Sequence, residues 1–446
     1  MSLPLPPLPY QIPGARFLAS KTRAGLFDEM GVGKTAQAIF ALDHLQLMRG
    51  VVVCPASVRE VWAGEFRKFS GYRRKILKAR NIHDLGLWLK GRADVLLVSY
   101  ELAAKWAVRM EGDLFDFLIF DESHYLKNPD AARTRSMLGT QCDGANGLAR
   151  WAGRVWFLTG TAMTNDPTDI WPFLRFCGGT PLTRAPFTAR YFRSRMRTFS
   201  ASQEPIEAMI PELRQAIGSC SLRRTQEEAG LQLPPVWLTT ITVDGDTEEI
   251  TALLRDHPGL DAAILDAVEK GGLSFLDAQH VATLRRLVGE AKAPAYAAML
   301  VDELKRGGKD KQVIFGLHTR AGQIVTEALK AEGLDGVTLI GSTSEKDRIE
   351  AVQRFQNDPA CRWLWGNITA AGTGHTLTAA CHIDMFEQAW APAPNAQALF
   401  RVRRIGQTRN VTGRFISLAG SIDEVVTESV ARKTAAIMKI EGTQAA

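Results

Sequence analysis

Short apolar runs separated by longer amphipathic stretches recur through the first half of the chain. Four of them are candidate strands, at residues 51–54, 95–98, 117–120 and 155–158. Continuous runs of Val, Leu, Ile and Phe are typical of strands in a parallel sheet, because helices cover both faces of such a sheet and bury the strands. The pattern therefore predicts an α/β fold.

A second α/β unit is predicted after residues 246–290, a stretch that shows only helical patterns. Its candidate strands are residues 311–316, 337–340 and 363–365. A chain of 446 residues is too long for one ordinary core, and Pro234 with Pro235 marks the expected boundary region. We therefore expect two domains, 1–232 and 233–446, with a basic helical insertion near 180–225 in the first and the insertion at 246–290 in the second.

The composition, 46% hydrophobic and 23% charged, is that of a soluble globular protein. No apolar run reaches the roughly 18 residues that span a bilayer, and the proline-rich start lacks the features of a secretion signal. The six cysteines are scattered, with no pair or neighbouring histidine at zinc-ligand spacing. We expect no structural metal and no membrane contact, and a protein that is not secreted: cytoplasmic in a bacterium or viral host, or nuclear in a eukaryote.

The net charge of +6 permits an acidic partner without identifying one. Basic residues gather in two patches. The first comprises Arg73, Arg74, Lys75, Lys78 and Arg80, and the second comprises Arg184, Arg190, Arg193, Arg195 and Arg197 with aromatic residues between them. Arg and Lys neutralise phosphates while aromatic faces stack on bases, although each patch alone is equally consistent with a solvated helix face.

The strongest chemical signal is residues 28–35, which lie between an apolar pair and an apolar helical run. Gly31 and Gly33 would let backbone N–H groups close around phosphate oxygens at a helix N-terminus, while Lys34 neutralises charge and Thr35 ligates Mg²⁺. The first glycine of the general G-x-x-x-x-G-K-S/T pattern falls on Asp28. Alone, the stretch is therefore also consistent with an ordinary glycine-rich turn.

Two carboxylates follow the third candidate strand. Asp121 would hold the Mg²⁺ of a bound nucleotide through water, and Glu122 would orient or deprotonate the attacking water. Upstream of the loop, Gln11 offers one donor and one acceptor, which matches the N6 and N7 edge of adenine. Together with Lys34 and Thr35, these residues predict an NTPase, with ATP and Mg²⁺ as the expected cofactors.

Further polar groups end the other strands. Ser57 and Ser99 lie at the edge where open α/β sheets bind ligands. Thr159 and Thr161 follow the fourth strand, where their hydroxyls would sense the γ-phosphate or the state of His124. The glycine-rich residues 370–376 lack the spacing of a dinucleotide site, so we interpret them as a tight loop that approaches a phosphate.

Arg401 and Arg404 are three residues apart and would project from one face of a helix. The second domain has no phosphate loop of its own. Two arginines presented by such a domain are what an arginine finger requires, because they would stabilise charge on the transferring phosphoryl group.

In this order, the motifs resemble those of the Swi/Snf-type ATPases of helicase superfamily two over nearly the whole chain. The stretches that carry the resemblance are residues 10–11, 28–35, 54–55 with Trp62, 99–100, 121–124, 158–161, 341–343 with Arg348, 372–374 and 397–407. Residues 289–292 and the loop at His318 look most like the fork-remodelling, annealing-helicase branch.

The resemblance implies two tandem RecA-like lobes with ATP between them and duplex DNA gripped across both. It implies the same nucleotide roles for Gln11, Lys34, Thr35, Asp121 and Glu122, and a finger pair at Arg401 and Arg404. The residues expected to face DNA are Pro55, Ser57, Ser99, Tyr100, His318, Thr319, Gly372, Thr373 and Trp390. Those expected to couple nucleotide and DNA binding are His124, Thr159, Thr161 and Gln397.

The leading functional hypothesis is an ATP-dependent translocase that remodels duplex or branched DNA by fork regression, strand annealing or branch migration. An alternative is a motor that displaces a protein from nucleic acid or drives a larger repair or defence complex. A nucleotide-gated DNA-binding module without motor activity is a third. We expect a monomer that binds double-stranded or branched DNA, with single-stranded DNA and a protein as further candidate partners.

Overall fold

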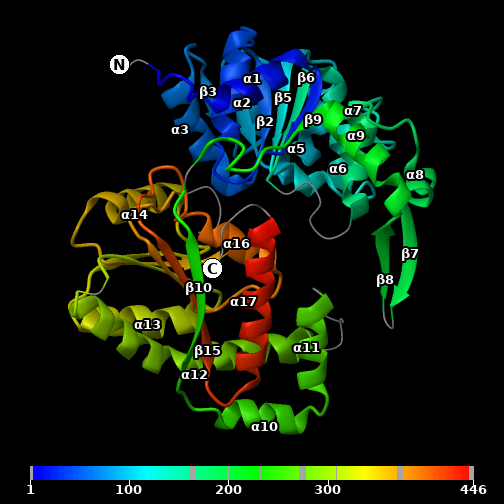
Figure 1. Cartoon of the computed structure of the whole chain (residues 1–446). Helices are drawn as coiled ribbons and strands as arrows, with labels where there is room; N and C mark the ends of the chain where they lie inside the picture. The colour runs from blue at the N-terminus through cyan, green and yellow to red at the C-terminus, as the bar shows by residue number, and fades with distance from the viewer. Residues whose placement is uncertain are drawn as a thin grey trace. The chain divides into compact units, whose positions relative to one another are not determined.

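The computed structural model divides the chain into two units, Met1–Leu231 and Gln232–Ala446 (Figure 1). The structure describes residues 4–160, 167–197, 200–231, 233–270, 278–307, 309–368 and 376–440. Within these residues no helix is long and apolar enough to cross a membrane. Each unit is built on its own parallel sheet.

A seven-stranded sheet forms the centre of the first unit, with the strand order β3-β4-β2-β5-β6-β1-β9 and parallel pairing throughout. Its strands are β1 (Arg23–Leu26), β2 (Gly50–Val53), β3 (Ile76–Lys78), β4 (Val95–Val98), β5 (Phe115–Asp121), β6 (Ala152–Leu158) and β9 (Ser221–Leu222). The four strands that the apolar runs predict are thus confirmed as β2, β4, β5 and β6.

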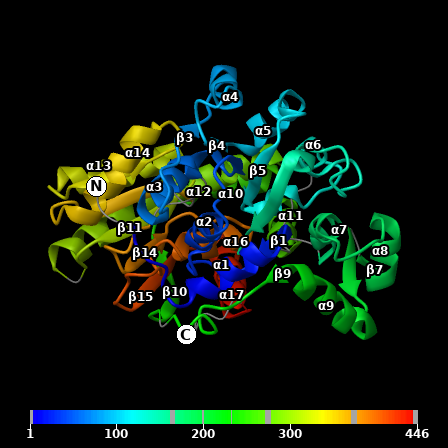
Figure 2. The ribbon, with the colours of Figure 1, turned by 90° about the horizontal axis from the view of Figure 1, so that it is seen from above.

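Helices cover both faces of this sheet, as Figure 2 shows from above. They are α1 (Gln11–Ser20), α2 (Lys34–His44), α3 (Arg59–Phe69), α4 (Ile82–Leu89), α5 (Tyr100–Trp106), α6 (Ala132–Leu138) and α7 (Trp171–Cys177). Side chains alternate between the two cores along each strand: Val52 packs with α1, α2 and α3, whereas Val51 and Val53 pack with α4 to α7. Burial on both faces explains why these strands are continuously apolar.

The segment near residues 180–225 departs from the helical insertion that the sequence predicts. Helix α8 (Arg184–Tyr191) and α9 (Ile210–Cys220) flank an antiparallel hairpin of β7 (Phe192–Arg197) and β8 (Ser200–Pro205), which extends away from the sheet of the first unit (Figure 1). Phe192 is the first hairpin residue and is buried beside Phe187. The chain then returns to the sheet as β9.

The basic patches are partly neutralised. Arg74 is buried and pairs with Asp43 at 2.5 Å, so its assignment to an exposed basic surface is wrong. Lys78 pairs with a glutamate, and in the second patch Arg184 and Arg190 each pair with a carboxylate. Charge counting from sequence therefore overestimates the positive surface that is free to bind an anion.

The second unit contains a six-stranded parallel sheet with the order β10-β15-β14-β11-β13-β12. Its strands are β10 (Val236–Val243), β11 (Gln312–Gly316), β12 (Gly336–Leu339), β13 (Trp363–Asn367), β14 (His382–Met385) and β15 (Val411–Leu418). Strands β11, β12 and β13 are those that the sequence predicts, whereas β10, β14 and β15 are not foreseen.

The helices of the second unit are α10 (Glu248–Asp256), α11 (Leu260–Lys270), α12 (Ala278–Lys305), α13 (Thr319–Ala331), α14 (Glu345–Asn357), α16 (Pro392–Leu399) and α17 (Ile422–Ile440). Helices α12 and α13 pack on one face of the sheet, around Ile314 of β11 and Trp363 of β13. Helix α17 packs along β10 and β15.

Candidate active site

The phosphate loop joins β1 to α2 at the edge where the strands of the first sheet end. Gly31 has φ +85° and Gly33 has φ +74°, which is the left-handed region that side chains other than glycine rarely adopt. Helix α2 begins at Lys34, and Thr35 lies half-buried in its first turn. Lys34 Nζ donates to the carbonyl oxygens of Asp28 at 2.7 Å and Glu29 at 3.1 Å, so the ammonium group already faces the loop.

The acidic pair lies at the same edge, because β6 pairs in parallel with both β1 and β5. Asp121 ends β5, and its carboxylate accepts hydrogen bonds from Trp62 Nε1 at 2.7 Å and from the Glu122 backbone N–H at 3.0 Å. Burial and the neighbouring Glu122 charge raise the pKa of Asp121 to about 6, although Trp62 and Lys34 favour the ionised form. A nearby cation would relieve this repulsion.

Glu122 is held in an unusual backbone conformation. Its φ and ψ are both 51°, the left-handed region, which costs a residue other than glycine about 1–3 kcal/mol. Strain of this kind persists where the surroundings fix the backbone, and it is frequent in active sites. This conformation ends β5 and starts a short 3-10 helix at Ser123–Leu126, which keeps His124 close to Glu122.

A polar chain links Glu122 to β6. His124 Nδ1 lies 3.4 Å from Glu122 Oε2 and 3.2 Å from Thr159 Oγ1. Burial, with a contribution from Lys127, lowers the pKa of His124 to about 4, so the imidazole is neutral at physiological pH. Of the other predicted coupling residues in the first unit, Thr161 lies outside the described residues.

Gln11 lies against the phosphate loop. It is buried at the start of α1, its Oε1 accepts the Leu8 N–H at 2.9 Å, and a Cβ atom built on Gly33 would stand 2.8 Å from Gln11 Nε2. Its contact with adenine remains a prediction, but the side chain is beside the loop that would bind the phosphates of the same nucleotide.

The oxygen ligands of this site suit a Mg²⁺ ion that is held partly by the bound nucleotide, and in the described part of the chain they do not form a site in which every ligand comes from the protein. The described residues contain no group of three or more His, Cys, Asp or Glu side chains that could hold a metal ion. The Thr35 hydroxyl and the Asp121 carboxylate are hard oxygen ligands, and Mg²⁺ is commonly held by one or two such groups together with substrate phosphates. When bound there, Mg²⁺ would neutralise phosphate charge.

The predicted DNA-facing residues of the first unit divide into two pairs. Pro55 and Ser57, which follow β2, are partly exposed. Ser99 and Tyr100 are buried: Ser99 Oγ caps α5 by accepting the Leu102 N–H, and Tyr100 OH donates to the Asp121 carbonyl at 2.8 Å. Both hydroxyls therefore support the local structure of the first unit, and the expectation that the segment beginning at Ser99 faces DNA stays a prediction.

In the second unit, Glu387 organises the loops after β11 and β14. Its buried carboxylate accepts hydrogen bonds from the backbone N–H groups of Leu317 at 2.7 Å and His318 at 2.8 Å, and His318 Nδ1 lies 2.6 Å away. A Cβ on Gly289 of α12 would stand 2.4 Å from Glu387 Oε1, so a larger residue here would displace the Glu387 carboxylate. The arrangement fixes His318 and leaves Thr319 exposed at the start of α13.

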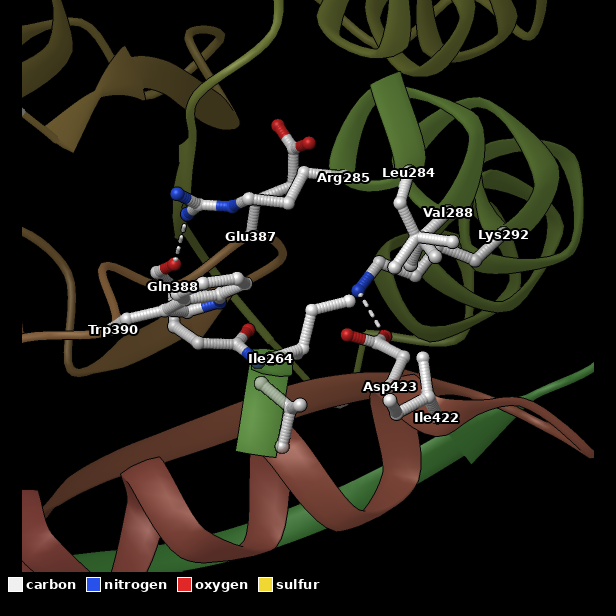
Figure 3. A pocket seen from close by; sticks show the side chains of 11 residues that line it. Ile264, Leu284, Arg285, Val288, Lys292, Glu387, Gln388, Trp390, Ile422 and Asp423 are labelled. Atoms are coloured by element: carbon white, nitrogen blue, oxygen red, sulfur yellow. Dashed lines mark hydrogen bonds and ion pairs between the residues drawn. The ribbon is translucent and has the colours of Figure 1, made fainter. Parts of the chain in front are cut away.

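A pocket lies beside this loop, between α11, α12 and α17 of the second unit (Figure 3). The Arg285 guanidinium lies 4.8 Å from the ring centroid of Trp390 and donates to the Gln388 carbonyl at 2.9 Å, and burial lowers the pKa of Arg285. Lys292 is paired with Asp423 at 2.8 Å. Trp390 is thus held from one side by Arg285, while Gly372 and Thr373 lie outside the described residues.

The arginines proposed as a finger pair do not lie on a helix, because α16 ends at Leu399. Arg401 is buried in the turn that follows, and its carbonyl accepts the Leu377 N–H. Arg404 Nη1 donates to Thr376 Oγ1 at 2.9 Å. The expectation of a shared helical face is therefore wrong, although both residues belong to one turn. Gln397 lies half-buried on α16.

Sequence reasoning missed three residues that shape these sites: Trp62, Arg224 and Glu387. Trp62 is noted only for its resemblance to a family motif, and nothing local to it points to Asp121. Arg224 binds Asp28 of the phosphate loop, which lies 196 residues earlier in the chain. Such contacts depend on which strands become neighbours, and spacing along the chain does not encode that.

With this geometry established, comparison with known proteins assigns the family. The SNF2-related domain model matches residues 10–282, and the model of the helicase conserved C-terminal domain matches residues 295–406. The chain belongs to the SNF2-related family. Its two parallel-sheet units match the tandem RecA-like domains of that family, which confirms the resemblance drawn from the motifs.

The similarity to individual proteins is modest in sequence identity. The chain is 28% identical to the "SWI/SNF-related matrix-associated actin-dependent regulator of chromatin subfamily A-like protein 1" of Drosophila melanogaster, over 97% of this chain and 56% of that protein. It is 28% identical to the human "DNA annealing helicase and endonuclease ZRANB3", over 96% of this chain and 39% of that protein. The chain thus spans about half or less of the length of these relatives.

Among solved structures, the chain is similar to the Sulfolobus solfataricus SWI2/SNF2 ATPase core in complex with dsDNA. The sequence identity is 20%, the TM-score is 0.45, and the match covers 100% of this chain and 98% of that one.

Proposed function

We propose that this protein uses ATP hydrolysis to move along duplex or branched DNA and to remodel it, by fork regression, strand annealing or branch migration. The observation that carries the proposal is the similarity to relatives named as annealing helicases over 96% of this chain, and it is supported by a phosphate loop and an acid pair that end neighbouring parts of one sheet. Matching over almost the whole chain means that both units take part in the similarity.

In this proposal Lys34 and Thr35 bind the phosphates and Mg²⁺, Asp121 holds the metal through water, and Glu122 orients the attacking water. The partly buried carboxylates of Asp121 and Glu122 suit these roles, because two adjacent carboxylates attract a divalent cation and a polarised water. Arg401 and Arg404 would supply positive charge to the transferring phosphoryl group.

The coupling of nucleotide state to DNA is assigned to the loops at the strand ends. The chain of contacts from Glu122 through His124 to Thr159 would transmit changes at the γ-phosphate. In the second unit, Glu387 would keep His318, Thr319 and Trp390 in place for contact with the DNA backbone.

A four-way-junction assay tests the proposal. Junctions with homologous arms are incubated with the protein and ATP, and the conversion to duplex products is followed by native gel electrophoresis. The expected result is ATP-dependent conversion that fails with ADP and with Glu122→Gln. ATP-dependent turnover without any movement or annealing of junctions, forks or complementary strands would instead favour a motor that acts on a DNA-bound protein.

A further inference from the structure

Arg224 occupies a position in the nucleotide site that its place in the sequence does not suggest. It follows β9, the edge strand, which pairs in parallel with β1 through Gly25 opposite Ser221 and Leu26 opposite Leu222. Because β1 leads into the phosphate loop, this pairing brings the segment after β9 alongside that loop. The Glu29 N–H donates to the Arg224 carbonyl at 2.9 Å, which extends the pairing into the loop itself.

The Arg224 side chain binds the loop through Asp28, the residue that stands at the first glycine of the general phosphate-loop pattern. Nε donates to Asp28 Oδ1 at 3.2 Å and Nη2 to Asp28 Oδ2 at 2.5 Å, in a bidentate arrangement. The Asp28 side chain is fully buried and that of Arg224 is 13% exposed. A buried carboxylate needs such a partner, because an unpaired charge in this position is strongly unfavourable.

The same guanidinium reaches the segment proposed to contact adenine. Arg224 Nη1 donates to the Tyr10 carbonyl at 2.8 Å, directly before Gln11, and Nη2 donates to Gln37 Oε1 of α2 at 2.8 Å. Gly14 of α1 leaves room for this contact, since a Cβ there would stand 1.7 Å from Gln37 Oε1 and 3.1 Å from Arg224 Nη2. One side chain therefore joins α1, the phosphate loop and α2.

The position of Asp28 also affects Lys34. The Asp28 carbonyl accepts the Lys34 ammonium at 2.7 Å, so fixing the Asp28 side chain also fixes the oxygen against which Lys34 rests. Gln226, two residues after Arg224, adds a second clamp: its N–H donates to Glu29 Oε2 at 2.8 Å and its Nε2 donates to the Met30 carbonyl at 2.7 Å. The loop is held along several consecutive residues.

We propose that Arg224 is a positioning residue that sets the distance between the adenine-contacting segment at Gln11 and the phosphate loop, and thereby determines nucleobase selectivity. It touches no reacting atom in this role. The bidentate fork matters, because lysine offers a point charge and cannot bind Asp28, Tyr10 and Gln37 together in the same geometry. The inference rests on ATP use at this site, so the test begins with that property.

The experiment measures dissociation constants for ATP and GTP by calorimetric titration of the full chain with Mg²⁺ and without DNA. Wild type, Arg224→Gln, Arg224→Lys, Asp28→Asn and the double variant Arg224→Gln/Asp28→Asn are compared. Arg223→Gln is the matched control, since Arg223 is the exposed neighbour. Absence of ATP binding by wild type would contradict the proposed function itself, before any variant is considered.

With ATP binding established, the expected result for Arg224→Gln is an ATP affinity at least about 10-fold lower, with the preference for ATP over GTP falling toward one. Arg224→Lys should recover part of both, and the double variant should lose less than the sum of the single losses. Melting temperatures measured in parallel separate folding from positioning. Unchanged affinity and selectivity, or an equal loss for ATP and GTP, would overturn the proposal.

Should Arg224→Gln fail to fold, Gly14→Ala provides a second test, because it leaves the charges intact and displaces the side chains of Gln37 and Arg224. It should lower ATP selectivity in the same direction. Gly218→Ala is its matched control, because a Cβ at Gly218 meets nothing within 4 Å. A folded Gly14→Ala protein with the selectivity of wild type would contradict the inference.

Discussion

Arg414 provides the sharpest prediction for the second unit, because it connects a buried aspartate and a partly exposed glutamate from different elements. Nε and Nη2 donate to Asp384 of β14 at 2.7 and 2.5 Å, and Nη1 and Nη2 donate to Glu303 of α12 at 2.5 and 2.9 Å. Asp384 is fully buried and also accepts a hydrogen bond from Tyr296 OH at 2.8 Å. Arg414→Met removes the cation and keeps a similar apolar volume.

The cost follows from the charge left behind. Breaking a buried ion pair by removing one partner destabilises a protein by about 3–5 kcal/mol, because the remaining charge lacks both water and a partner. That is a large share of the roughly 5–15 kcal/mol that separates folded from unfolded states. Adding Asp384→Asn removes the unpaired charge, so the double variant should be more stable than Arg414→Met alone.

The assay is urea unfolding followed by circular dichroism at pH 7.5. Lys305→Met is the control, because its ion pair with Glu332 is about half exposed and such surface pairs contribute about 0–1 kcal/mol. An Arg414→Met variant that loses no more stability than this control would refute the reasoning. So would a double variant that is less stable than the single one.

Acidic pH should reduce the effect of Arg414→Met. Burial alone would raise the pKa of Glu303, but hydrogen bonds from Arg414 and Lys309 outweigh it and lower the pKa. Since the folded-state pKa lies below the unfolded one, this contribution is present at neutral pH and is lost as the pH falls through the folded value. The stability difference between wild type and Arg414→Met should therefore shrink in acid.

Further predictions concern the loops. Arg404→Ala should lower kcat far more than ATP affinity, because the residue is proposed to act on transition-state charge; equal losses in steady-state kinetics and nucleotide titration would contradict this. Glu387→Gln should lower DNA-stimulated hydrolysis more than DNA-independent hydrolysis. Hydrogen bonds from His318 and Leu317 lower the pKa of Glu387 in the folded protein, although its burial alone would raise it. The stability that the ionised Glu387 contributes should therefore be lost as the pH falls through its folded-state pKa, and thermal melts at several pH values would show this. Ser99→Ala should cost about 1 kcal/mol of unfolding free energy by loss of a helix cap, and an unchanged denaturation midpoint would refute it.

Apolar periodicity predicts the central strands well, because strands buried on both faces must be continuously apolar. Strands β2, β4, β5 and β6 satisfy this condition and were predictable. Strand β14 was not, since it carries Asp384 in its interior, and only the distant Arg414 makes that burial tolerable. Because Asp384 interrupts the apolar run, the pattern of apolar residues does not predict this strand.

In the candidate active site, too, local patterns predict some features, whereas others depend on residues that are distant in the sequence. Local patterns place the phosphate loop and the acid pair, because each motif ends its own strand and parallel strands end at one edge of the sheet. Ser99 and Tyr100 show a role that their motif does not predict: a hydroxyl at a strand end can cap the next helix or support a neighbouring loop as well as face a ligand. Arg224 was beyond reach because β9 returns to β1 only after a hairpin and two helices.

The central claim is that the site in the first unit hydrolyses ATP in response to DNA. The most direct measurement is steady-state ATP hydrolysis without nucleic acid and with single-stranded DNA, duplex, a fork, a four-way junction and RNA, at one salt concentration. We predict strong stimulation by duplex or branched DNA, and none in Lys34→Ala or Glu122→Gln. Full activity without nucleic acid, no activity with any of these, or retained turnover in either variant would contradict the claim.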